Sequence, residues 1–208
     1  MVKLKGPMSS AEASGTLGQA ATFSSWKGRA YARAKTVPTN PKSELQVSVR
    51  TMLGFLSQQW AAISAANKAT WEESAALTEV APYSAYLSTN LARWRQFHAP
   101  TKVYPATEGG LTPVTTAISF TGDKAHVHIF YNYSNAREGW GALIFHTPTA
   151  IALGDRTNLI MILPIAASAP TTGTYHTTVL GLHHFRLQNF TTSGKLGGQS
   201  INFTVTVT

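Results

Sequence analysis

The sequence predicts an α+β protein of several domains, in which an extended basic arm precedes a small helical unit and a C-terminal all-β sandwich. Apolar residues recur at spacings of three and four between residues 43 and 98, as in amphipathic helices, and at spacings of two after residue 113, as in strands. The intervening sequence HAPTKVYPATEGGLTP is rich in Pro and Gly, which predicts a linker. We therefore expect four segments, residues 1–42, 43–98, 99–113 and 114–208.

The first segment carries most of the positive charge. The chain has 17 Lys and Arg against 9 Asp and Glu, a formal charge of +8. Residues 1–42 hold seven of the cations and a single acid, Glu12, a net charge of +6. Glycines and prolines recur through the segment and exclude a long helix, so we expect an irregular, extended arm. A basic arm contacts an acidic protein surface, binds nucleic acid or stays solvated.

Ser43 begins the helical pattern. Gln46 follows three residues later, as in a capping box, which predicts that Ser43 is the N-cap of a helix. Apolar residues from Leu45 to Ile63 then recur on one face, so the helix is expected to span about 20 residues.

Two further helices are expected in the same segment. The second begins at Asn67, and the third is capped by Ser84 and ends in the sequence FHAP. Tryptophans occur in all three helices, at Trp60, Trp71 and Trp94. They could stack on bases or sugars, but the apolar faces that carry Trp60 and Trp94 favour a role in the core.

The C-terminal segment has the alternation and turn signals of seven strands. AISFTGDKAHVHIFYNYS predicts two strands joined by a turn at Gly122 and Asp123, and GWGALIFHTP, TNLIMILPIA, GTYHTTVLGL, HHFRLQNFTT and SINFTVTVT predict one strand each. Seven strands in about 100 residues imply a sandwich of the immunoglobulin or fibronectin type III style. Trp140 suits the aromatic core position of such domains, and the absence of cysteine favours the fibronectin-like version.

Residues with catalytic or metal-binding chemistry are few. The absence of cysteine excludes disulfides and thiolate ligands. His126 and His128 lie two apart on a predicted strand and share a face, a spacing that zinc can use. A solvent-facing pair is the simpler interpretation, so we predict no metal site.

We find neither paired carboxylates nor a G-x-S-x-G, P-loop or dinucleotide motif, and therefore expect no enzyme, no catalytic residue and no cofactor.

Aromatic residues alternate with the cations of the arm. Solvated tails are usually depleted of aromatics, and the arm has too little apolar surface of its own to bury Trp26 and Tyr31. The arm therefore folds back on its own helices or lies on a neighbour. Aromatic anchors beside Arg donors suit a protein interface. We predict an interface made by Phe23, Trp26, Lys27, Arg29, Tyr31, Arg33 and Lys35.

Fixed residue types also recur at fixed spacing across residues 15–95. The pattern runs G-x-x-G, then W-K-G-R-x-Y-x-R, then P-x-N-P-x-S-x-x-Q-x-x-x-R, and then a Trp. Its positions here are Gly15, Gly18, Trp26, Lys27, Gly28, Arg29, Tyr31, Arg33, Pro38, Asn40, Pro41, Ser43, Gln46, Arg50 and Trp60, and Trp71 and Asn90 also fit. This pattern resembles that of a family of phage and prophage virion proteins.

The resemblance implies a structural role without catalytic residues. It implies a capsid decoration, minor capsid, connector or tail-associated protein, present in many copies, assembled in the host cytoplasm and bound to other virion proteins. The predicted sandwich looks like the immunoglobulin-like domains of phage capsids and tails.

Two alternatives remain open. One is a module that binds carbohydrate or a host cell surface, with Tyr131, Tyr133 and Tyr175 as candidate contacts on the sandwich. The other is a protein that binds nucleic acid through its arm. A membrane partner is not expected, because no apolar run approaches the roughly 18 residues of a spanning helix.

Overall fold

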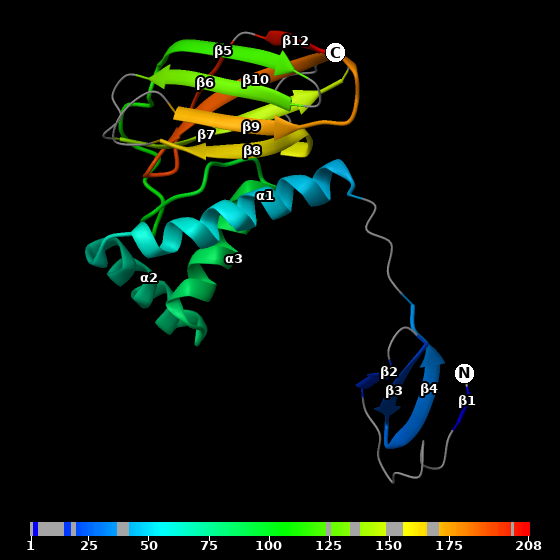
Figure 1. Ribbon diagram of the computed structural model, residues 1–208. Helices are drawn as coiled ribbons and strands as arrows, with labels where there is room; N and C mark the ends of the chain where they lie inside the picture. Colours follow the sequence, from blue (N-terminus) through cyan, green and yellow to red (C-terminus); the bar gives the residue numbers. More distant parts are fainter. Residues whose placement is uncertain are drawn as a thin grey trace. The chain divides into compact units, whose positions relative to one another are not determined.

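The computed structural model divides the chain into two compact units, Met1–Pro41 and Lys42–Thr208 (Figure 1). The residues it describes are 2–3, 15–17, 20–36, 42–123, 126–133, 138–148, 156–165, 171–200 and 202–208. In these residues the first unit contains strands, and the second contains both helices and strands.

The first unit is a four-stranded antiparallel sheet, where we expected an irregular arm. Its strands lie in the order β1-β4-β3-β2. They span Val2–Lys3 (β1), Gly15–Leu17 (β2), Ala21–Trp26 (β3) and Arg29–Ala34 (β4). The expectation was wrong because ATFSSW and RAYARA place small and polar residues on both faces, which removes the apolar alternation that marks a half-buried strand. Gly18, Pro38, Asn40 and Pro41 of the virion-protein pattern lie outside the described residues.

The first helix begins where the sequence predicts. Helix α1 spans Glu44–Gln59 with Ser43 as N-cap, and a 3₁₀ turn over Trp60–Ala62 (η2) extends it to nearly the expected length. The Ser43 side chain makes no capping hydrogen bond, so the predicted capping box is not formed.

Helix α2 begins two residues before the predicted start, and the N-cap of α3 is Ala81, three residues before the predicted cap at Ser84. Helix α2 spans Ala65–Thr78, because Ser64 is its N-cap and accepts a hydrogen bond from the Asn67 backbone N–H at 3.4 Å. Helix α3 spans Pro82–Arg95, because a proline is tolerated in the first turn of a helix, where its missing N–H costs nothing.

Eight strands form a sandwich of two antiparallel sheets. The smaller sheet has the order β5-β6-β9, and the larger has the order β11-β10-β7-β8 with β12 also paired to β10. The strands are β5 (Thr115–Asp123), β6 (His126–Tyr133), β7 (Gly139–Thr147), β8 (Leu159–Pro164), β9 (Thr171–His176), β10 (Gly181–Thr191), β11 (Leu196–Gln199) and β12 (Phe203–Val207), and a 3₁₀ turn, η3 (Arg156–Asn158), precedes β8. The fourth strand, β8, pairs with β7, whereas constant-type immunoglobulin domains place their fourth strand in the other sheet. Gly122 and Asp123 belong to β5 and do not form the predicted turn.

The larger sheet is covered on both faces. Its inner face shares a core with the smaller sheet, built from residues such as Ile129, Ile144 and Phe185. Its outer face packs on the helices, which Figure 1 shows along the β8 side of the sandwich. Trp140 belongs to this outer layer, where its ring lies 5.2 Å from that of Phe55, and not to the core between the sheets that we expected for it.

The expected linker, residues 99–113, is an ordered part of the same unit. Asn90 of α3 holds Thr101 through a bond from Nδ2 to the Thr101 carbonyl (3.1 Å) and a bond from the Thr101 N–H to Oδ1 (2.7 Å). The next residue, Lys102, donates its backbone N–H to the Thr192 carbonyl at the end of β10 (2.8 Å). The helices and the sandwich are therefore parts of one unit, and not the two separate segments that we expected.

Candidate functional site

The Lys27–Gly28 turn joins β3 and β4 into a tight hairpin. Both turn residues have positive φ, 50° at Lys27 and 72° at Gly28, which matches the two-residue turns that follow the twist of a hairpin. Lysine is unusual at the first of these positions, where Asn or Asp is preferred, so the sequence signal for this hairpin is weak.

The strand register puts four of the predicted interface residues on one face. Trp26 pairs with Arg29, Ser24 pairs with Tyr31, and Thr22 pairs with Arg33. Residues directly opposite each other, and residues two apart on one strand, share a face of the sheet. The hairpin face therefore presents Trp26, Arg29, Tyr31 and Arg33, and we call these four residues the cation–aromatic face.

Phe23 does not belong to this face. It pairs with Ala32, and its own side of the hairpin carries alanines and Ser25. Lys27 lies in the turn, and its Nζ is 4.9 Å from the centre of the Trp26 ring, a cation–π contact. Lys35 follows β4 and donates its backbone N–H to the Ala20 carbonyl at 3.2 Å.

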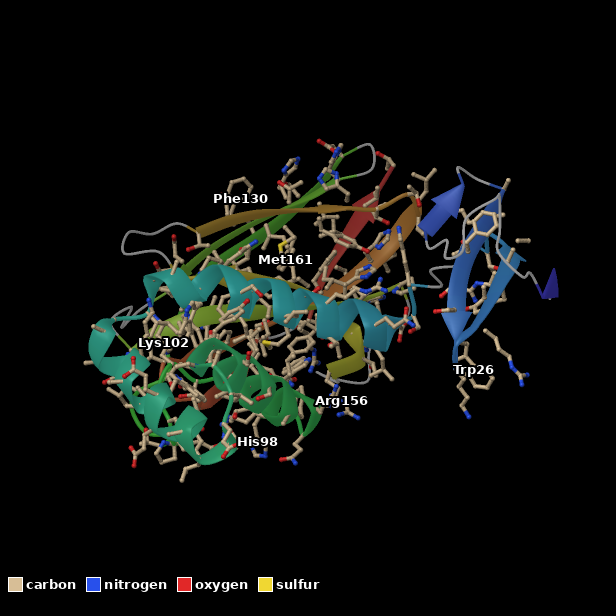
Figure 2. All side chains as sticks on the ribbon, turned by 90° about the horizontal axis from the view of Figure 1, so that it is seen from below. Trp26, His98, Lys102, Phe130, Arg156 and Met161 are labelled. Carbon is tan, nitrogen blue, oxygen red and sulfur yellow. The ribbon has the colours of Figure 1, made fainter. Side chains whose placement is uncertain are left out.

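The cation–aromatic face is open. Trp26 is 67% exposed, and Figure 2 shows its side chain projecting from the turn end of the hairpin. Arg29 and Arg33 are exposed on either side of the half-buried Tyr31. Among residues 15–16 and 20–36, whose burial is described, none is fully buried. A small sheet needs an apolar face packed against something to be stable, and none of these residues supplies a buried core.

The histidines form a second candidate site on the outer face of the smaller sheet. His126 pairs with Asp123 of β5 on one side and with His176 of β9 on the other. The Asp123 carboxylate contacts His126 Nδ1 at 3.1 Å and His128 Nε2 at 3.3 Å, and the rings of His126 and His176 lie 4.6 Å apart. The hydrogen bond from His128, helped by that from His126, lowers the pKa of the Asp123 carboxyl.

The sequence predicts the shared face of His126 and His128, but not the approach of Asp123 and His176, which the strand register brings together. Among the described residues, no group of three or more His, Asp or Glu side chains is arranged to hold a metal ion. The cluster is thus a carboxylate hydrogen-bonded to two imidazoles on an open surface.

Another pair of histidines, the buried His183 and the partly buried His146, lies at the same end of the sandwich. His183 Nε2 lies 2.9 Å from the Val179 carbonyl, which can only accept, so this nitrogen carries the proton. His183 Nδ1 and His146 Nε2 share a 2.7 Å hydrogen bond. Burial, together with the neighbouring His183 and His184, lowers the pKa of His146 to about 4. The hydrogen bond from His183 holds the chain at Val179.

The tryptophans of the helices are structural. Trp71 and Trp94 are buried, and their indole N–H groups donate to the Lys102 carbonyl (2.8 Å) and to Ser48 Oγ (3.0 Å). Trp60 is partly buried and packs against the same core. The core role predicted for Trp94 is confirmed, and none of the three forms an open stacking platform.

Comparison with known proteins gives only a distant likeness. No family model matches the sequence, and no curated protein is similar to it. A solved structure of the chicken CNTN1 FN1–FN3 domains has 12% sequence identity and a TM-score of 0.36, over 47% of this chain and 32% of that chain. None of the described helices is long and apolar enough to cross a membrane.

Proposed function

We propose that this chain is a non-enzymatic structural protein of a virion, attached to another virion protein through the cation–aromatic face of its N-terminal sheet. The observation that carries the proposal is the register of β3 and β4, which gathers Trp26, Arg29, Tyr31 and Arg33 on one open face. None of residues 15–16 and 20–36 is buried, so a partner surface would supply the apolar cover that the β3–β4 hairpin needs.

The chemistry of this face indicates the nature of the partner surface. Aromatic and Arg side chains dominate the binding energy of protein interfaces. The unit Met1–Pro41 has six cations and one acid, so the complementary surface is acidic with an apolar pocket for Trp26. The virion-protein resemblance supports a multi-copy partner of the capsid, connector or tail. The unit Lys42–Thr208 then carries the sandwich as the displayed part.

The experiment is incorporation of variants into particles. Trp26→Ala removes the anchor from an exposed position, and we expect at least a tenfold loss of the chain from purified particles, since interface hot spots contribute about 2 kcal/mol or more. Phe130→Ala is the matched control, because Phe130 is an exposed aromatic (42%) on β6 of the sandwich (Figure 2). Incorporation of Trp26→Ala at the wild-type level would refute the proposal.

The alternation of Arg29, Tyr31 and Arg33 along β4 also suits a nucleic-acid backbone with stacked bases, which is the second candidate. Binding of this kind weakens steeply with salt, in proportion to the number of phosphates that the cations neutralise. A salt titration of DNA binding by the purified chain therefore tests this candidate, and no binding at low salt would exclude it. The glycan alternative loses one of its candidate residues, since Tyr131 is 1% exposed and lies in the sandwich core.

A further inference from the structure

The sandwich carries an open groove, and all of its described lining residues are uncharged. The groove has a volume of about 500 Å³ and lies where the chain enters β5, beside β11 and the start of β12. Its lining residues are Thr112, Pro113, Val114, Thr115, Ile118, Asn189, Gly198, Gln199, Ser200 and Phe203. A volume of this size is in the range of pockets that bury apolar ligands. In a chain of charge +8, a lining without any charge favours an apolar, neutral occupant.

Asn189 gives the groove an unpaired acceptor. It is 2% exposed, and its Nδ2 donates to the Pro113 carbonyl (2.9 Å) and to Thr115 Oγ1 (3.1 Å). Its Oδ1 has no hydrogen-bond partner among the described residues. A buried acceptor without a partner costs free energy, so an occupant that brings an N–H to this wall gains from it.

The same unit carries an exposed apolar projection, which we call the apolar tip. Val179, Leu180 and Leu182, around the connection from β9 to β10, are 56%, 70% and 52% exposed. Residues 177–182 contain no charged side chain.

Two hydrogen bonds hold the apolar tip in place. The Val179 N–H donates to Thr177 Oγ1 at 3.1 Å, and the buried His183 donates to the Val179 carbonyl. A tip that is already ordered loses little conformational entropy when it binds.

The apolar tip of one molecule cannot enter its own groove. The tip precedes β10, while Asn189 lies eight residues after Gly181 on that strand, a separation of about 26 Å along a strand. Figure 1 shows the β9–β10 connection at the right-hand end of the sandwich and the start of β5 at the left. Both features belong to the compact unit Lys42–Thr208, so their separation is set by the fold.

We propose that the apolar tip of one copy of this chain inserts into the groove of a second copy. Both surfaces are uncharged, the tip is ordered, and the groove accepts aliphatic side chains and offers the Asn189 acceptor to the backbone of the tip. The two surfaces are different patches, so the contact is head-to-tail and builds a ring or a filament of sandwiches. This contact is separate from the hairpin attachment proposed above and does not require it.

Two substitutions block the two sides of the contact without disturbing the fold. Leu180→Glu places a charge on the exposed tip. Gly198→Leu fills the groove, because a Cβ at Gly198 meets no atom within 4 Å and its φ is not in the left-handed region. Leu77→Glu is the matched control, since Leu77 is a comparably exposed leucine (78%) on α2, outside both surfaces.

Sedimentation velocity of the full chain over a dilution series measures the association. We expect association that grows with concentration for the wild type and for Leu77→Glu, and monomers for Leu180→Glu and for Gly198→Leu. An equimolar mixture of these two variants should form a 1:1 dimer and nothing larger, because the intact tip of Gly198→Leu enters the intact groove of Leu180→Glu.

Three results would overturn the inference: a wild type that stays monomeric, a Leu180→Glu variant that associates like the wild type, or a mixture that stays monomeric. Trp26→Ala separates this contact from the hairpin attachment, and we expect it to self-associate normally. If Trp26→Ala abolished self-association while Leu180→Glu preserved it, the tip and groove would be excluded and the hairpin attachment would stand.

Discussion

Replacing Asn90 by alanine should destabilise the unit Lys42–Thr208 strongly. Asn90 is fully buried in α3, and its Nδ2 donates to the carbonyls of Tyr86 and Thr101, each at 3.1 Å. Its Oδ1 accepts the Thr101 N–H at 2.7 Å. Thr101 is itself 1% exposed, so water cannot replace the lost partners unless the helices separate from the connection.

The magnitude follows from the groups left unpaired. Asn90→Ala leaves both the N–H and the carbonyl of Thr101 without their side-chain partner. A buried polar group without a partner costs about 1–3 kcal/mol, so the free energy of unfolding should fall by about 2–5 kcal/mol. With an m-value of about 2 kcal/mol per M in urea, the midpoint should fall by about 1–2.5 M.

Urea unfolding followed by tryptophan fluorescence measures this change, because Trp71 and Trp94 are buried in the same layer. Gln58→Ala, at an exposed position of α1, is the control and should change the free energy by no more than about 0.5 kcal/mol. A loss below 1 kcal/mol for Asn90→Ala, with an unchanged m-value, would show that the Asn90 bridge does not hold the helices to the sandwich.

Two further predictions concern the sandwich and the first helix. The pKa of His146 lies near 4 in the folded chain, below its usual 6.5, so the unfolded chain binds more protons between these values. The free energy of unfolding should therefore fall as the pH drops from about 6.5 to 4. In His146→Gln this fall should be smaller. If urea unfolding at a series of pH values gave the wild type and His146→Gln the same dependence on pH, the lowered pKa of His146 would be contradicted. Gly141→Ala would place a Cβ 2.8 Å from Phe190 Cζ and should cost about 1–3 kcal/mol. Gly54→Ala, with no atom within 4 Å of its new Cβ, should instead stabilise α1 by about 0.5–1 kcal/mol, and thermal unfolding of the pair tests both signs.

The helices could be predicted because their signals are local. The Ser43 N-cap and the three- and four-residue spacing of apolar residues depend only on near neighbours in the chain. The errors in the starts of α2 and α3 also have local causes. Ser64 is the N-cap of α2, and Pro82 lies in the first turn of α3.

The β3–β4 hairpin escaped prediction because neither of its strands has a buried face. The sequence predicts that Trp26 and Tyr31 pack against another surface. This prediction is the same whether the segment is an extended arm or a sheet. Their placement on one face with Arg29 and Arg33, and the placement of Phe23 on the other, required the β3–β4 register. A register is a long-range property that no spacing within one strand reveals.

Composition and periodicity alone predict the basic N-terminal segment, the helices and most strands of the sandwich, and they mark Trp26 and Tyr31 as residues that need a contact surface. Tertiary structure decided which of these segments meet. It packed Trp140 against Phe55 on the outer face of the larger sheet, made residues 99–113 part of the core unit, and joined Asp123 to His126 and His128. It also separated the apolar tip from the groove. The local pattern predicts which side chains avoid water. Their partners lie on segments as far apart as Thr51 and Ile160, and only the packing of the folded chain selects among them.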